Sequence, residues 1–257
     1  MTTTLGVTRS DGVLTLTLDR PDQLNALTDE LSDAVAHELE QAASYDDLRV
    51  VLLRGAGRAF CAGADISAPD GPMQLDVRAL DRANRIVRAI TRLDRPVVAG
   101  VHGVAAGVGC SIALASDLCV ASESASFLLA FTRIGLMPDG GSSATVASSI
   151  GRARAMRMAL LAEPLTGREA YDAGLVSHLA EDDAFETVLS EVAGRLAAAA
   201  PLALAATKRA VNAASLRGLD DALERERTGQ TMLLRTADAA EGMRAFAERR
   251  RPEFEGE

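Results

Sequence analysis

The pattern of apolar and polar positions predicts strands that alternate with helices along the first 180 residues. Residues 13–18 (VLTLTL) alternate apolar and polar side chains, which is the period of a half-buried strand. Residues 50–53, 97–101 and 118–121 are short apolar runs, which predict buried strands. Thr28 is an N-cap residue for a helix that carries leucine and valine at four-residue spacing. This alternation indicates an α/β core.

Helices are predicted between the later strands and over the C-terminal part of the chain. They include residues 76–93 and 109–115, and the sequence from Thr166 to Glu169 is a capping box that opens another. From Phe185 onward the pattern is helical with few interruptions, at Pro201 and near Gly218. We therefore expect a catalytic core over residues 1–195 and a helical module over residues 196–257.

Composition narrows the class of protein. The 257 residues are 48% hydrophobic and 25% charged, which is enough for one large core. The net charge of −9 argues against nucleic acid or an anionic membrane as partner. Three cysteines at irregular spacing argue against a disulfide framework. No apolar run is long enough to span a bilayer, and the first residues lack a signal-peptide pattern. We predict a cytoplasmic protein.

Two glycine-rich stretches carry the chemical information. Residues 58–66 (RAFCAGADI) and 103–111 (GVAAGVGCS) each follow an apolar, strand-like run. Turns this poor in side chains let backbone N–H groups approach a ligand oxygen closely. Two such groups, one from each turn, form an oxyanion hole for a thioester carbonyl. No Cys/His cluster has metal-ligand spacing and no nucleotide-binding motif is present, so we expect neither a metal nor a separate cofactor.

Together these stretches resemble the crotonase superfamily, the enoyl-CoA hydratase/isomerase fold. The resemblance extends over nearly the whole chain, in family order. Its other elements are residues 20–27, Phe127, residues 135–138, residues 165–176 and residues 241–246. It implies a spiral of ββα units with a C-terminal helical trimerisation module, assembled as a homotrimer or a dimer of trimers. It also implies an acyl-CoA substrate, with coenzyme A as part of that substrate.

The resemblance assigns roles to individual residues. The oxyanion donors map to the N–H groups of Ala64 and Val108, although Val108 stands where many members have glycine, so its side chain must point away. Phe246 and Arg249 match positions that, in the family, help to hold the CoA of a neighbouring subunit. The basic run at residues 249–251 also fits a solvated helix end. The residues that the resemblance places along substrate or CoA are Gln23, Leu24, Ala62, Asp65, Ile66, Gly107, Phe131, Phe246 and Arg249.

One departure from the family pattern bears on mechanism. Typical hydratases use two glutamates, at positions that hold Ser111 and Phe131 here, and neither side chain is a carboxylate base. Asp139 instead matches the acid/base of some isomerases, and the surrounding sequence looks most like the isomerases of phenylacetate catabolism. We expect burial to raise the pKa of Asp139, with Phe131 and Met137 as apolar neighbours.

Alternatives remain at several positions. Asp139 also fits a turn residue of a Pro-Asp-Gly-Gly sequence, and Asp65 fits a residue that braces its loop. Ser111 and His102 lack an orienting Asp, so a nucleophile–base pair is not expected. The leading hypothesis is a double-bond or ring isomerase. The others are an enoyl-CoA hydratase of fatty-acid or aromatic-acid degradation and a non-catalytic acyl-CoA-binding protein.

Overall fold

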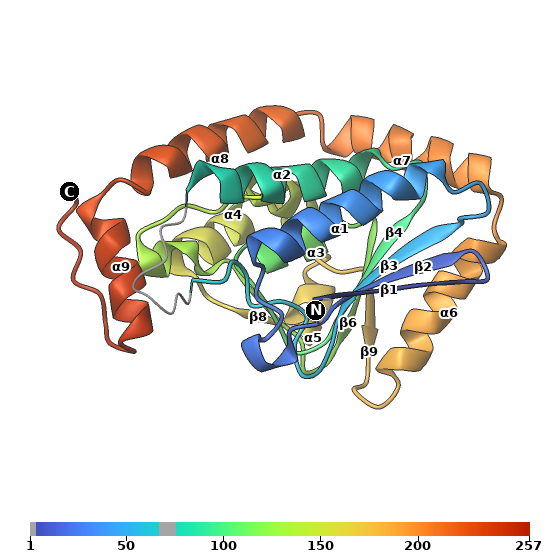
Figure 1. Ribbon diagram of the computed structural model, residues 1–257, viewed down its shortest axis with the longest axis horizontal. Coiled ribbons are helices and arrows are strands. Elements are labelled where there is room, and N and C mark those ends of the chain that lie inside the picture. The colour runs from blue at the N-terminus through green and yellow to red at the C-terminus, as the bar shows by residue number, and fades with distance from the viewer. Residues whose placement is uncertain (1–3, 67–75) are drawn as a thin grey trace.

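The residues that the structure describes form two β-sheets surrounded by helices (Figure 1). A computed structural model describes residues 4–66 and 76–257. The irregular loop predicted over residues 67–75 lies outside the described residues. The mixture of sheets and helices confirms the predicted α/β class.

The main sheet has six strands in the order β1-β2-β3-β4-β6-β9. Its first two strands form an antiparallel hairpin, and every later neighbour is parallel. The parallel strands deliver the chain repeatedly to one edge of the sheet, where loops gather. The strands are β1 (Leu5–Ser10), β2 (Val13–Leu18), β3 (Val50–Gly55), β4 (Val97–Val101), β6 (Leu118–Ser122) and β9 (His178–Ala180).

A smaller sheet of three strands lies beside the glycine-rich turns. Its order is β5-β7-β8, with β5 (Val104–Ala106) parallel to β7 (Ser126–Leu128) and β8 (Leu165–Thr166) antiparallel to β7. Strand β5 leads directly into α3 (Val108–Ala115). The second glycine-rich turn is therefore a strand-to-helix junction, as predicted.

Helices cover both faces of the main sheet (Figure 1). On one side lie α1, α2 and α3, with α7 and α8 outside them, and α6 covers the other side. The helices not yet given are α1 (Asp29–Gln41), α2 (Val77–Arg92), α4 (Ser142–Leu161), α5 (Gly167–Asp172), α6 (Phe185–Ala198), α7 (Pro201–Ser215), α8 (Leu219–Leu233) and α9 (Ala237–Ala247). Short 3-10 helices are η1 (Pro21–Gln23), η2 (Ala42–Ser44) and η3 (Ala130–Ile134).

Strand β3 shows how the period of two builds two cores. Val51 and Leu53 belong to the large cluster under α1 and α2, whereas Val50 and Leu52 belong to the cluster under α6. Successive side chains of a strand point to opposite faces, so an unbroken apolar run satisfies both layers. The interpretation of this run as a buried strand is confirmed.

The predicted capping residues are confirmed. The Thr28 hydroxyl accepts a hydrogen bond from the N–H of Leu31 at 3.2 Å. Thr166 and Glu169 form the reciprocal capping box that starts α5. These caps satisfy N–H groups that the first turn of a helix leaves without a partner.

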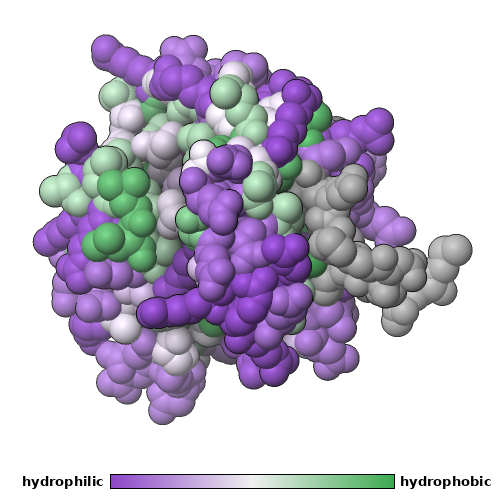
Figure 2. Space-filling view, turned by 90° about the vertical axis from the view of Figure 1, so that its left-hand side faces the viewer, coloured by the Kyte–Doolittle hydropathy of each residue, from purple (hydrophilic) through white to green (hydrophobic). Residues whose placement is uncertain are grey.

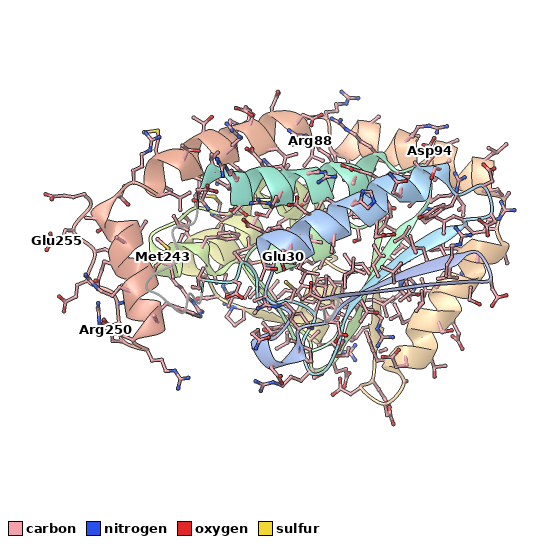
Figure 3. The ribbon with its side chains drawn as sticks, in the orientation of Figure 1. Glu30, Arg88, Asp94, Met243, Arg250 and Glu255 are labelled. Carbon is pink, nitrogen blue, oxygen red and sulfur yellow. The ribbon has the colours of Figure 1, made fainter. Side chains whose placement is uncertain are left out.

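The C-terminal helices are fixed to the core by charged contacts. Lys208 of α7 is buried, lies 2.7 Å from Asp117 and also donates to the Ile90 carbonyl. Arg88 of α2, labelled in Figure 3, pairs with Asp220 at the start of α8 at 3.0 Å. These pairs hold α7 and α8 against α2 and the sheet.

The break in this helical region lies after α6, at residues 199 and 200. The division predicted after residue 195 therefore falls inside α6, and the division itself stays a prediction. Over the described residues, no single helix has the length and apolarity to cross a membrane; α6 and α7 reach them only together, with a bend of 106° between them.

Candidate active site

The structure brings the two glycine-rich turns into contact. Cys61 of the first turn forms a parallel β-bridge with Ala105 of β5, and its carbonyl accepts from the N–H of Ala106 at 2.9 Å. Gly63 has φ +101°, and a Cβ atom there would lie 2.9 Å from the Ala106 carbonyl oxygen. Gly107 has φ +52°, a conformation that favours glycine. The glycines therefore allow the two backbones to lie side by side.

The N–H groups of Ala64 and Val108 have no hydrogen-bond acceptor among the described residues. The Leu27 N–H donates to the Gly63 carbonyl, and the Leu27 carbonyl accepts from the Asp65 N–H. Leu27 therefore pairs with the residues before and after Ala64 and does not bond the Ala64 N–H. Val108 is the first residue of α3, where a helix leaves its N–H groups unpaired and its dipole is positive. Both predicted oxyanion donors are thus available in adjoining turns.

The segment before α1 lies along the first glycine-rich turn. The carbonyl of Leu24 accepts from the N–H of Ala62 at 2.9 Å, and Gln23 beside it is exposed. Arg20 lies 2.8 Å from Asp65, and both side chains are largely buried. This ion pair braces the loop, as expected for Asp65, and the contact of Asp65 with CoA stays a prediction. The residues predicted for this strip are Gln23, Leu24, Ala62, Asp65 and Ile66.

Asn25 fixes this segment, a role that the sequence interpretation missed. Its side chain is fully buried and donates to the carbonyls of Ala56 and Ala59, both at 2.8 Å. Its Oδ1 accepts from the N–H of Arg20 at 2.9 Å, and its backbone is left-handed with φ +58°. Asparagine tolerates this left-handed conformation better than most residues, and its amide supplies both a donor and an acceptor. It therefore suits this position.

We expect Asn25→Gly to destabilise the protein by about 2–4 kcal/mol, because three hydrogen bonds are lost and the carbonyls of half-buried Ala56 and buried Ala59 lose this partner. Glycine accepts φ +58°, so the loss measures the side chain alone, whereas Asn25→Ala adds backbone strain. Urea unfolding of both variants is the measurement. Equal stability of the glycine variant and the wild type contradicts the assignment.

Asp139 lies in a turn that packs on the first turn of α3. The hydroxyls of Ser111 and Ser142 both donate to the Asp139 carbonyl, at 2.7 and 2.8 Å. Gly140 has φ +63°, and a Cβ atom there would lie 2.8 Å from Cβ of Ser111 and 3.6 Å from Cγ2 of Val108. The structure thus places Asp139 beside the helix that Val108 opens.

The Asp139 side chain is a buried carboxyl with only one oxygen engaged. Gln230 of α8 donates to Oδ2 at 3.0 Å, and Oδ1 has no hydrogen-bond partner among the described residues. Burial raises the pKa of Asp139 to about 7; the Gln230 hydrogen bond opposes this rise and the charge of Glu226 adds to it. The expected direction is confirmed. The polar groups that modify this pKa, Gln230 and Glu226, lie on α8, and burial by Phe131 and Met137 stays a prediction.

Helix α8 therefore contributes polar groups to the site that sequence reasoning missed. Glu226 is buried and accepts from the N–H groups of Gly141 and Ser143, at 2.7 and 3.0 Å. One signal was present: the buried face of α8 carries two polar residues where an apolar stripe continues the helical period. That face consists of Leu219, Ala222, Leu223, Glu226 and Gln230.

Comparison with known proteins agrees with this geometry. Residues 8–257 match the family Enoyl-CoA hydratase/isomerase. The chain belongs to this family. A 1,2-epoxyphenylacetyl-CoA isomerase of Escherichia coli strain K12 is 39% identical, with 95% of each chain covered. A 2,3-dehydroadipyl-CoA hydratase of the same strain is 35% identical, covering 97% of this chain and 98% of the relative.

Solved structures confirm the fold. A crystal structure of an enoyl-CoA hydratase from Mycobacterium avium subsp. paratuberculosis K-10 has a TM-score of 0.93 and 49% identity, covering 98% of this chain and 99% of the other. The crotonase-like fold expected from the resemblance is thereby established. Relatives named as hydratases and as isomerases both lie at moderate identity.

In this member of the enoyl-CoA hydratase/isomerase family, the two positions where the resemblance predicts glutamates hold Ser111 and Phe131, neither of which has a carboxylate. Ser111 is fully buried and its hydroxyl is engaged with the Asp139 carbonyl. Phe131 in η3 is buried in the main core cluster. His102 lines a surface hollow of about 700 Å³ with Arg54 and Glu186, so it is not the partner of Ser111.

The C-terminal candidates lie on the outside of the chain. Phe246 on α9 is 61% exposed, and Arg249 follows the helix on its exposed end. Neighbouring Arg250 pairs with Glu241 of α9 at 2.9 Å (Figure 3). Figure 2 shows the face that carries α9, where hydrophobic patches interrupt a mainly hydrophilic surface. Contact of Phe246 and Arg249 with the CoA of a neighbouring subunit stays a prediction.

Proposed function

We propose that this enzyme of the enoyl-CoA hydratase/isomerase family is an isomerase that shifts the double bond of an enoyl-CoA thioester. The observation that carries the proposal is Asp139, a buried carboxyl with one oxygen unpartnered among the described residues, in a turn that packs on the first turn of α3, the helix that begins at Val108. Asp139 moves the proton, and the N–H groups of Ala64 and Val108 hold the thioester oxygen. Ser111 and Phe131 supply no second carboxylate for the activation of water.

One carboxyl group is sufficient for this reaction. The Asp139 carboxylate removes a proton from C2 of a 3-enoyl thioester, and the electron pair of that C–H bond passes into the conjugated enolate, with negative charge on the thioester oxygen. The protonated Asp139 then returns the same proton to C4, which leaves a 2-enoyl thioester. A pKa raised to about 7 by burial suits a group that must both accept and donate a proton near neutral pH.

The relatives support the acyl-CoA substrate and leave two reaction types in view. The relative named as a 1,2-epoxyphenylacetyl-CoA isomerase favours isomerisation, including that of a ring epoxide. The structure named as an enoyl-CoA hydratase, 49% identical, favours hydration as the second candidate. The absence of carboxylates at Ser111 and Phe131 supports isomerisation over hydration.

The proposal extends to substrate binding and assembly. The strip from Gln23 to Ile66 would hold pantetheine and nucleotide, with Gly107 beside the thioester. Phe246 and Arg249 would hold the CoA of a neighbouring subunit in a homotrimer or dimer of trimers. Their exposure at the end of α9 supports this assignment. Sedimentation analysis of the intact protein tests the assembly.

Product analysis tests the reaction itself. The protein is incubated with 3-enoyl-CoA esters that carry deuterium at C2, and the products are separated and weighed. We expect a 2-enoyl product of unchanged formula with part of the deuterium at C4, because one buried carboxyl carries the proton between both carbons. A product heavier by one water contradicts the proposal and assigns a hydratase. Binding by calorimetry without any product assigns a non-catalytic acyl-CoA-binding protein.

A further inference from the structure

We propose that Gln230 is a positioning residue, which holds Oδ2 of Asp139 so that Oδ1 is the oxygen that receives and returns the substrate proton. The inference rests on the proposed function of Asp139. Gln230 lies on α8, 91 residues beyond Asp139 in the chain, and is 2% exposed. Its amide meets Asp139 within hydrogen-bond distance, at 3.0 Å.

The orientation of the Gln230 amide is fixed by the backbone of Met137. The Met137 N–H donates to Oε1 of Gln230 at 3.1 Å, and the Met137 carbonyl accepts from Nε2 at 2.9 Å. A backbone N–H only donates, so the amide oxygen must face it and the NH₂ group must face Asp139. Both amide hydrogens are then used, one on the Met137 carbonyl and one on Oδ2 of Asp139.

This orientation makes the two oxygens of Asp139 unequal. Because Gln230 presents only a donor, Oδ2 is an acceptor whether Asp139 is ionised or protonated. The proton of the neutral acid therefore lies on Oδ1, the oxygen without a hydrogen-bond partner among the described residues. A buried acceptor left unpaired is costly, so Oδ1 requires an explanation, and a role in proton transfer to the substrate is the one that this proposal gives.

Helix α8 holds the whole turn from Met137 to Ser143. Glu226 lies one helical turn before Gln230 and accepts from the backbone of Gly141 and Ser143. Gly229 allows α8 to approach the turn closely, since a Cβ atom at this position would lie 2.5 Å from Sδ of Met137. Asp139 is consequently held at its carbonyl by α3 and α4 and at its carboxyl by α8.

Replacement of Gln230 by leucine tests the proposal. We expect kcat for the double-bond shift to fall about 10–100-fold with KM within about three-fold, because the carboxyl is misplaced while the acyl-CoA contacts remain. The acidic limb of the kcat profile should move to higher pH, since the lost hydrogen bond favoured the ionised form of Asp139. Thr231→Val is the matched control, because its hydroxyl donates only to Arg227 of the same helix.

A second variant and a second measurement keep the outcome decisive. Gln230→Glu has nearly the same volume and retains an acceptor for the Met137 N–H, which makes it the second variant should the leucine variant unfold. It loses the donor to Oδ2, and its negative charge should move the acidic limb further up. Infrared titration of the Asp139 carboxyl band, identified by its loss in Asp139→Asn, reads the same shift without turnover. Unchanged kcat, pH profile and infrared titration in the folded Gln230 variants overturn the proposal. Full activity of Asp139→Asn instead overturns the proposed function, while the infrared titration of Asp139 in the Gln230 variants still reports on Gln230.

Discussion

Substitution of Asp139 by asparagine is expected to lower kcat for the double-bond shift by about a thousand-fold, with little change in KM. The amide has nearly the same shape, so the buried turn and its contacts with Ser111 and Ser142 are retained. An amide neither takes nor returns the proton, and a positioned acid–base group contributes about 10²–10⁴-fold to the rate. Steady-state turnover of a 3-enoyl-CoA ester is the measurement.

The pH dependence of the wild type follows from the same group. Asp139 must be ionised to remove the first proton, so kcat/KM should fall as the pH drops through about 7, the value to which burial raises the pKa of this carboxyl. The residual rate of Asp139→Asn should lack this limb. An unshifted acidic limb near pH 4 in the wild type contradicts the assigned burial of Asp139.

The same substitution should make the folded protein more stable above pH 7. In the unfolded chain the Asp139 pKa is near 3.8, whereas burial raises it in the fold to about 7. The native state therefore holds the proton more tightly, and stability is lost as the pH rises from about 4 to about 7. We expect the free energy of unfolding of Asp139→Asn to exceed that of the wild type by about 1–3 kcal/mol at pH 8. The neutral amide avoids the burial of a charge, although one of its N–H groups is left unpaired. Urea unfolding at pH 4 and pH 8 checks that the gain appears only at the higher pH.

The local sequence was sufficient to predict much of the fold and the two glycine-rich turns. The apolar run at residues 50–53 and the N-cap at Thr28 are signals carried by neighbouring residues, and both are confirmed. The strand β1 and the helix α4 were not assigned from the sequence. Helix α4 contains four serines and a break at Gly151, where φ is +76°, so no continuous apolar face marks it.

The environment of Asp139 could not be predicted in the same way. Its pKa depends on burial and on Gln230 and Glu226, and the orientation of its carboxyl depends on Gln230; both residues lie on α8, about ninety residues later. Only the packing of α8 over the turn brings these groups together. The position of Asp139 within a turn was visible in the chain, but the buried carboxyl that supports the proposed acid–base role could be seen only in the tertiary contacts.

The second large effect is expected from removal of a single backbone N–H. Val108 is the first residue of α3, the position where proline is best tolerated in a helix because its N–H has no partner within the helix. Val108→Pro should therefore retain the helix, together with the Gly107 N–H bond to the Leu128 carbonyl, and lose one of the two oxyanion donors. The side chain of Val108 changes too, so Val108→Ala is the matched variant that keeps the N–H.

We expect kcat of the proline variant to lie about 100–1,000-fold below that of the alanine variant, which corresponds to about 3 kcal/mol of transition-state stabilisation. The loss should appear in kcat more than in KM, because negative charge develops on the thioester oxygen only in the enolate. Circular dichroism and urea unfolding establish that both variants are folded. Equal kcat values for the two folded variants contradict the role of the Val108 N–H, and would leave the positive end of α3 and the Ala64 N–H as the remaining stabilisation of the enolate.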